Sequence, residues 1–181
     1  MTADEFIAWS LAQSRDREGG KYELVDGHVV QLQSERLLHG EVKLAIASAL
    51  RAGIQKRKLP CFAHGDGATV RINKKKVYRP DALVYCGKRH GPNAIEIPDP
   101  MIIVEVISPD SVGRDHGDKV EAYFSLASVQ HCLIVDPDRK AIVQHRRGTG
   151  DEFYTRIRKT GALKLDPPGL EIAVADLFER E

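Results

Sequence analysis

The pattern of apolar residues in this 181-residue chain predicts a mixed α/β fold, in which helices flank a sheet of strands. Three observations lead to this class. Two stretches place apolar residues at helical spacing. Several short segments are rich in β-branched residues or alternate between apolar and polar side chains, as strands do. Residues 101–107 form an almost continuous apolar run, which is typical of a central strand covered on both faces.

The N-terminal part of the chain is expected to contain a short helix, a hairpin and a longer helix. Thr2 and Glu5 have the spacing of a capping box, which marks the start of a helix. Asp26-Gly27 lies between two strand-like runs and predicts a tight hairpin turn, because glycine adopts positive φ at little cost. Apolar residues recur at helical spacing over residues 42–53. The strands expected here and just beyond cover residues 22–25, 29–32, 68–72 and 77–85.

The C-terminal half is expected to combine strands with a second helix that begins near Gly117. This helix buries one face, because its apolar residues lie three or four positions apart. The residues of that face are Val120, Tyr123, Phe124 and Ala127. Strands are expected over residues 101–107, 131–135, 141–145, 152–158 and 170–174, before a short helical end. With 42% hydrophobic and 29% charged residues, the chain is predicted to fold as one domain over residues 1–181.

Composition and charge argue against several classes of protein. No apolar run approaches the roughly 20 residues needed to cross a bilayer. Asp4 and Glu5 stand where a signal peptide would carry positive charge. We therefore expect a cytoplasmic protein without a membrane partner. The net charge of +1 gives no support to strong nonspecific binding of nucleic acid.

The three cysteines, Cys61, Cys86 and Cys132, are far apart and form no Cys-x-x-Cys pair. This spacing excludes a zinc knuckle. We expect all three thiols to be reduced, as is usual in a cytoplasmic protein. Cys132 lies in an apolar run, where cysteine behaves as a small hydrophobic residue.

Two acids and a lysine are candidates for a metal and catalytic site. Glu105 interrupts the apolar run of residues 101–107, and burying an unpaired carboxylate is very unfavourable. Asp81 follows Pro80 at an expected strand start, where it could share an ion with Glu105; two such oxygen donors suit Mg²⁺ or Mn²⁺. Lys119 borders the buried face of the second helix, and its ammonium could stabilise charge on a phosphoryl oxygen. The alternative is a buried ion-pair cluster without catalysis.

Short motifs follow one another in a set order along nearly the whole chain, from about residue 2 to residue 178. They are Tyr22-Glu23-Leu24-Val25-Asp26-Gly27, His39-Gly40, Arg79-Pro80-Asp81, Val104-Glu105-Val106-Ile107-Ser108-Pro109, Asp115-x-x-x-Lys119 with Tyr123, and Leu133-Ile134-Val135-Asp136-Pro137. Each motif alone is weak, whereas the ordered set is specific. In this order they resemble the Uma family of putative restriction endonucleases, members of the PD-(D/E)XK nuclease superfamily.

The resemblance implies a restriction-endonuclease-like core that carries a magnesium-dependent phosphodiesterase site. The first acid of the superfamily maps to Asp81 and the second to Glu105, which would make both of them metal ligands and catalytic residues. The lysine expected two residues after the second acid would fall at Ile107, so this chain departs from the general pattern there. Sequences of the Uma type resemble this one in placing the lysine on the next helix, and Lys119 matches that place.

The resemblance also implies that Glu23 and His39 line the site. From the residues alone, two other interpretations stay open. Glu23 could be a hairpin carboxylate exposed to water, and His39 could be a hydrogen-bonded histidine of the core.

The predicted activity is that of an endodeoxyribonuclease that hydrolyses phosphodiester bonds of DNA with Mg²⁺ or Mn²⁺. We expect a homodimer, since many related nucleases address two DNA strands with two sites. The alternative is a nuclease-like fold that binds nucleic acid or a protein without cutting, because fold alone does not establish activity. A third interpretation, a toxin or an accessory protein of a mobile element, would use the same site as the nuclease.

Overall fold

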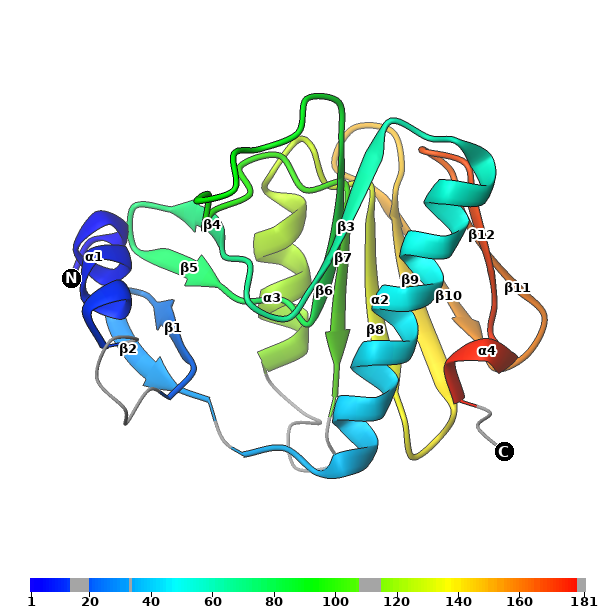
Figure 1. Cartoon of the computed structure of the whole chain (residues 1–181), viewed down its shortest axis with the longest axis horizontal. Coiled ribbons are helices and arrows are strands. Elements are labelled where there is room, and N and C mark those ends of the chain that lie inside the picture. Colours follow the sequence, from blue (N-terminus) through cyan, green and yellow to red (C-terminus); the bar gives the residue numbers. More distant parts are fainter. Residues whose placement is uncertain (14–19, 33, 108–114, 179–181) are drawn as a thin grey trace.

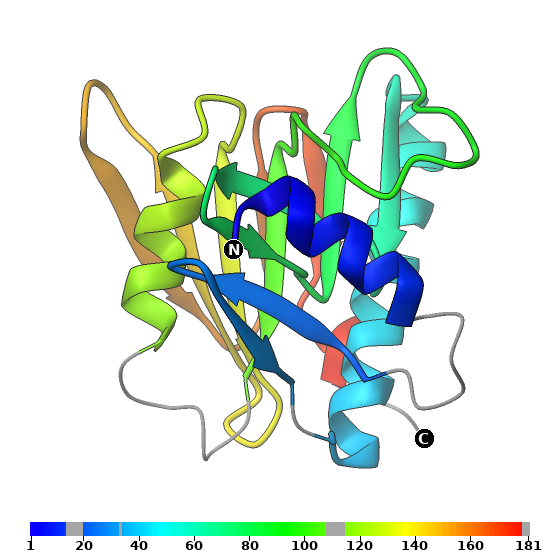
Figure 2. The same ribbon diagram turned by 90° about the vertical axis from the view of Figure 1, so that its left-hand side faces the viewer.

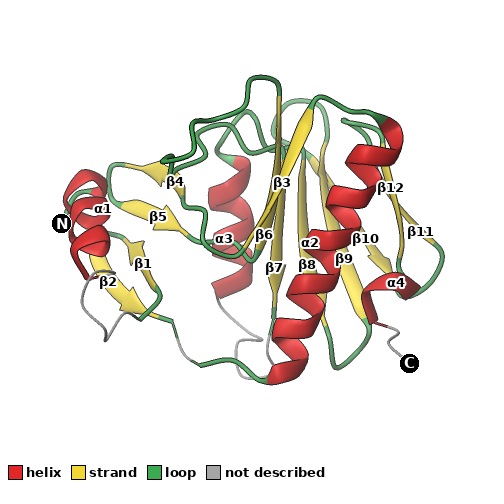
Figure 3. Ribbon diagram, viewed as in Figure 1, coloured by secondary structure: helices red, strands yellow, loops and turns green. Residues whose placement is uncertain are grey.

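The computed structural model describes residues 1–13, 20–32, 34–107 and 115–178 of the chain. Its helices are α1 (Ala3–Gln13), α2 (Leu37–Arg57), α3 (Asp115–Phe124) and α4 (Ala175–Phe178) (Figure 1). Its strands are β1 (Tyr22–Val25), β2 (His28–Gln31), β3 (Cys61–Gly65), β4 (Val70–Asn73), β5 (Lys76–Tyr78), β6 (Ala82–Cys86), β7 (Ile102–Val106), β8 (His131–Asp136), β9 (Ala141–Arg147), β10 (Phe153–Arg158), β11 (Ala162–Leu165) and β12 (Leu170–Ala173). The predicted mixed α/β class is confirmed (Figure 3). None of the helices in these ranges is long and apolar enough to cross a bilayer.

The larger sheet has six strands in the order β10-β9-β8-β7-β6-β3. β7 and β8 are parallel and are joined through α3, whereas the other neighbours are antiparallel. Helix α2 covers one face together with β11, β12 and α4, and α3 covers the other (Figure 1). Because side chains alternate along a strand, Ile102 and Val104 pack on the α2 side and Ile103 packs on the α3 side. The continuous apolar run of β7 is thus buried on both faces, as predicted.

A smaller sheet of four strands, in the order β2-β1-β5-β4, lies on the α3 side of the molecule (Figure 2). Tyr78 of β5 is buried in the same cluster as Tyr123 of α3, so the two sheets share a core there. Helix α1 covers the outer face of the small sheet, where Phe6 packs with Leu24 and Val77. This packing holds β1, which carries Glu23, in the small sheet between β2 and β5.

Two local predictions near the N-terminus are confirmed. The backbone N–H of Thr2 donates to Oε2 of Glu5 at 2.7 Å, and the N–H of Glu5 donates to Oγ1 of Thr2 at 3.3 Å. These are the reciprocal bonds of a capping box. Asp26 and Gly27 have φ values of 49° and 83°, which a two-residue hairpin turn of this hand requires.

The single strand predicted over residues 77–85 is wrong. β5 ends at Tyr78 in the small sheet, and β6 begins at Ala82 in the large one. Pro80 has no N–H to donate to a ladder, and residues 79–81 carry the chain from one sheet to the other. β3 and β11 were not predicted, because their short segments carry little apolar alternation. The Ser108-Pro109 part of the motif set lies outside the described residues.

The prediction of three reduced thiols is wrong for two of the cysteines. Cys61 and Cys86 form a disulfide across a sequence separation of 25 residues. The antiparallel pairing of β3 with β6 places these two residues directly opposite each other, and no local pattern in the sequence reveals that register. Cys132 is a free, buried thiol, which agrees with its expected role as a small hydrophobic residue.

His131, the first residue of β8, is fully buried and bridges the larger sheet to the segment between β11 and β12. Its Nε2 lies 3.0 Å from the carbonyl oxygen of Pro167, and its Nδ1 lies 3.3 Å from Nε2 of Gln144. A neutral ring fits both contacts, because Nε2–H donates to the carbonyl while Nδ1 accepts from the amide. Burial lowers the pKa of His131 to about 4, and the cation of Arg146 acts in the same direction.

Acid is therefore expected to destabilise the wild type more than a His131→Asn variant. The folded-state pKa of about 4 lies below the ordinary value of 6.5, so the contribution of neutral His131 to stability is complete above pH 6.5 and is lost as the pH falls toward 4. This gap corresponds to roughly 3 kcal/mol. Urea unfolding of both proteins across this pH range measures it. A free-energy difference between them that stays constant with pH would contradict the assignment.

Candidate active site

The carboxyl end of β7 is where the predicted site residues meet. β6 and β7 pair antiparallel with Ala82 opposite Val104, so the next pair in this register is Asp81 and Glu105. The backbone N–H of Asp81 also donates to the carbonyl oxygen of Val104 at 3.0 Å. Side chains of directly opposite residues extend from the same face of a sheet. The two acids, 24 positions apart in the numbering, therefore lie side by side.

Glu105 is buried, with 8% of its surface exposed. The hydroxyl of Tyr123 donates to its Oε1 at 2.5 Å, and Nζ of Lys119 lies 3.4 Å from its Oε2. Burial raises the pKa of Glu105 to about 7; the charges of Asp81 and Glu23 add to this, and Lys119 opposes it. A nearby second positive charge would therefore favour the ionised form strongly.

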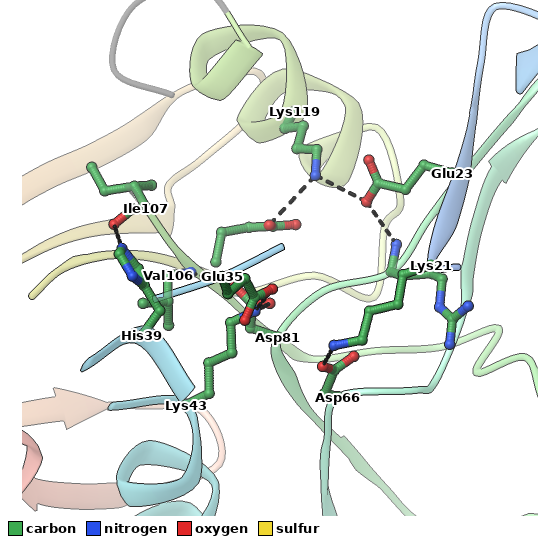
Figure 4. Close-up of polar contacts among 12 residues, drawn as sticks. Lys21, Glu23, Glu35, His39, Lys43, Asp66, Asp81, Val106, Ile107 and Lys119 are labelled. Atoms are coloured by element: carbon green, nitrogen blue, oxygen red, sulfur yellow. Dashed lines mark hydrogen bonds and ion pairs between the residues drawn. The ribbon is translucent and has the colours of Figure 1, made fainter. Parts of the chain in front are cut away.

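Lys119 connects Glu105 to the small sheet. Its Nζ donates to Oε1 of Glu23 at 2.9 Å, and the same oxygen accepts the backbone N–H of Arg79 at 3.0 Å (Figure 4). Burial alone would lower the pKa of Lys119, but Glu105 and Glu23 raise it above its ordinary value. The ammonium also lies 5.2 Å from the ring centroid of Tyr78. Lys119 is thus a charged group fixed by two carboxylates and an aromatic ring.

Glu23 is 3% exposed, so the interpretation as a water-exposed hairpin carboxylate is wrong. Its pairing with Lys119 brings it into the cluster around Glu105, and its role in a functional site stays a prediction. The sequence could not show this, because the contact joins residues 96 positions apart in different parts of the fold.

His39 lies in the first turn of α2 and is 3% exposed. Its Nε2 lies 3.0 Å from the carbonyl oxygen of Ile107, which directly follows β7 (Figure 4). Its Nδ1 is buried and has no hydrogen-bond partner among the described residues. His39 is therefore a buried, hydrogen-bonded histidine of the core. Its contact with Ile107 also holds the backbone segment that carries Glu105.

Asp81 is held by the backbone on one oxygen and by a lysine on the other. Its Oδ2 accepts the N–H of Val106 at 2.6 Å, and its Oδ1 lies 2.6 Å from Nζ of Lys43 (Figure 4). Lys43 also pairs with Glu35. Burial raises the pKa of Asp81 above its ordinary value, although Lys43 acts against this.

Lys43 was not predicted as a site residue, because it lies off the apolar stripe of its helix. It is 8% exposed. One signal was available: His39 and Lys43 are four residues apart, and positions with that spacing lie on one side of a helix. The hydroxyl of Tyr123 was missed for a different reason: this residue was assigned to the buried face of its helix for its ring alone.

The donor set fits a hard divalent cation. Asp81 and Glu105 offer carboxylate oxygens from adjacent strands, and Mg²⁺ commonly takes only one or two carboxylates and keeps several waters. Ammonium groups of Lys43 and Lys119 compensate these buried carboxylates in the structure. Over the described residues, no group of three or more His, Cys, Asp and Glu side chains converges on one point.

A family model described as "Uma2: Putative restriction endonuclease" matches residues 3–175 of the chain. The chain belongs to the Uma2 family. The family resemblance inferred from the ordered motifs is thereby confirmed. Among individual proteins, the uncharacterized protein slr1290 of Synechocystis sp. is 23% identical to this Uma2 chain over 179 residues, which cover 98% of this chain and 91% of that protein.

The Uma2 chain also has the fold of a solved structure. The crystal structure of a putative nuclease belonging to DUF820 from Anabaena variabilis superposes with a TM-score of 0.72 at 17% identity, covering 98% of this chain and 97% of that one. In this Uma2 protein Ile107 stands two residues after Glu105. Its N–H donates to the carbonyl oxygen of Val135, and its own carbonyl oxygen contacts His39. The lysine nearest Glu105 is Lys119 on α3, at 3.4 Å.

Proposed function

We propose that this Uma2 protein is a Mg²⁺- or Mn²⁺-dependent endodeoxyribonuclease that hydrolyses phosphodiester bonds of DNA. One observation carries the proposal: Asp81 and Glu105 occupy neighbouring positions on adjacent strands, with the Lys119 ammonium 3.4 Å from Glu105. The three residues are its catalytic group. Two adjacent carboxylates and a fixed cation are the groups that metal-assisted attack on a phosphodiester needs.

In this proposal each residue has a separate task. Asp81 and Glu105 would hold the ion, which supplies Lewis-acid polarisation and an activated water when bound. The ammonium of Lys119 would stabilise negative charge that develops on the phosphoryl oxygens. Glu23 positions that ammonium through the 2.9 Å contact to its Oε1. His39 holds the main chain that follows Glu105 through the carbonyl of Ile107.

A binding module without catalysis is the second candidate, and one observation favours it. The carboxylate oxygens of Asp81 and Glu105 all have a donor or cation of the protein within 3.4 Å, so the cluster can be satisfied without an ion. Such a module would bind nucleic acid or a protein through the same fold. A homodimer, with one site for each DNA strand, stays a prediction for both candidates.

Millimolar Mn²⁺ is expected to raise the melting temperature of the wild type and not that of Asp81→Asn. An ion present at about 100 times its dissociation constant stabilises the fold by roughly 2.7 kcal/mol. Calorimetry with and without Mn²⁺ measures this without any choice of substrate. The matched control is Asp118→Asn, which removes an exposed acid next to Lys119 and should respond as the wild type does. Equal responses of wild type and Asp81→Asn would refute the metal site and favour the binding module.

A further inference from the structure

The two lysines of the site are held in different ways. Lys119 donates to Glu23 at 2.9 Å and lies farther, 3.4 Å, from Glu105. Its closest partner is therefore a residue outside the proposed metal ligands. Lys43, in contrast, lies 2.6 Å from Asp81 itself. An ion bound at the two acids would leave the main contact of Lys119 intact but would compete directly with Lys43.

Lys43 contacts the oxygen of Asp81 that the main chain does not bind, and this oxygen is therefore the one left for an ion. Oδ2 of Asp81 is tied to the main chain by the N–H of Val106 at 2.6 Å. Oδ1 has Nζ of Lys43 as its close partner. A magnesium–oxygen bond is about 2.1 Å long, so the ammonium and the ion would be only a few ångströms apart. At that separation, in a site this buried, the ion and the ammonium repel each other and compete for the same oxygen.

Glu35 is a second carboxylate that can pair with Lys43 when Asp81 binds an ion. Lys43 already pairs with Glu35, which precedes α2. The side chain of Glu35 is 35% exposed, against 12% for Asp81 and 10% for Lys43, so Glu35 lies toward the solvent. A lysine side chain has a flexible four-carbon stem, so its ammonium can leave Asp81 and stay with Glu35 without any movement of the helix.

We propose that Lys43 is an exchangeable internal cation: in the metal-free protein it pairs with both Asp81 and Glu35, and when a divalent ion binds it gives up Asp81 and pairs with Glu35 alone. The inference rests on the proposed metal site. It assigns unlike tasks to the two lysines, since Lys119 remains with Glu23 while Lys43 gives up its carboxylate. The apparent affinity for the ion is then lower than the two acids alone would give, because every binding event displaces an ammonium.

Calorimetric titration with Mn²⁺ tests the exchange without any substrate. Lys43→Met keeps the aliphatic stem and removes the competing charge, so it should bind Mn²⁺ about tenfold more tightly than the wild type, or tighter still. Lys43→Arg keeps the charge and should show no gain. Lys56→Met is the matched control, because it removes an exposed lysine from the same helix and should leave the affinity unchanged.

Glu35→Gln tests the exchange independently if Lys43→Met does not fold without metal. Loss of the receiving carboxylate should weaken Mn²⁺ binding by about threefold or more, since the displaced ammonium has no partner. An unchanged or weaker affinity of folded Lys43→Met overturns the inference, as does an unchanged affinity of Glu35→Gln. If the wild type binds Mn²⁺ and Asp81→Asn does not, such a result refutes the exchange alone. If no protein of the set binds Mn²⁺, the metal site itself fails and the exchange fails with it.

Discussion

Asp81→Asn and Glu105→Gln are each expected to reduce metal-dependent DNA cleavage at least about 10³-fold, because each change removes one charged ligand of the ion that would activate water. Both substitutions are nearly isosteric. The side-chain amide introduced at position 105 can still accept from Tyr123, and the one introduced at position 81 can still accept from Val106. The amide nitrogen then faces Lys43 or Lys119, so each variant is expected to be less stable than the wild type, and the loss of cleavage is assigned to the chemistry for a variant that is folded under the assay conditions.

Single-turnover cleavage of duplex, branched and single-stranded DNA with Mg²⁺ or Mn²⁺ measures this effect. Circular dichroism of each variant verifies the fold. Asp118→Asn is again the control, since it changes an exposed acid and should cut at the wild-type rate. A variant of Asp81 or Glu105 that cuts as fast as the wild type would remove that residue from the catalytic group.

Lys119→Met is expected to lower the free energy of unfolding by about 3–5 kcal/mol, the usual cost of removing one partner of a buried charge pair. The side chain of Lys119 is 17% exposed, and those of Glu23 and Glu105 are 4% and 10% exposed. Its loss leaves two buried carboxylates without their shared cation. Chemical unfolding in metal-free buffer measures the change.

A double variant separates the charge effect from lost packing. In Lys119→Met with Glu23→Gln, the stranded carboxylate of Glu23 is absent, so part of the lost stability should return. Lys56→Met, on the exposed side of α2, should stay within about 0.5 kcal/mol of the wild type. A loss below about 1 kcal/mol for Lys119→Met would mean that water or protonation of Glu105, not Lys119, compensates these acids.

Glu105 could be identified from the sequence because it is an acid inside an otherwise apolar strand. A carboxylate in the middle of an apolar strand needs a partner wherever that strand is buried. The sequence offered Lys119 as a candidate beside this acid, but it did not reveal the role of the Tyr123 hydroxyl. Tyr123 and Lys119 come from α3, and their contacts with Glu105 depend on how that helix packs across the sheet.

For Asp81, the tertiary structure decided more of its position than the sequence did. Its residue type and the preceding Pro80 marked it as a candidate, but the expected strand around it was wrong. The break at residues 79–81 brings Asp81 to the end of β6, in register with Glu105. Lys43 reaches the same acid from α2 on the other face of the sheet. Groups from both faces can meet at Asp81 because it lies at a strand end.

The sequence by itself determined the mixed α/β class, the capping box of α1, the Asp26-Gly27 turn and the buried acid in β7. Each of these depends on neighbouring residues, so spacing along the chain is enough to predict it. Only the tertiary structure decided the Cys61–Cys86 disulfide, the burial of Glu23 and the contact of Lys43 with Asp81. These depend on sheet register and helix packing between distant segments, which are set by burial of the whole core and leave no periodic trace in the sequence.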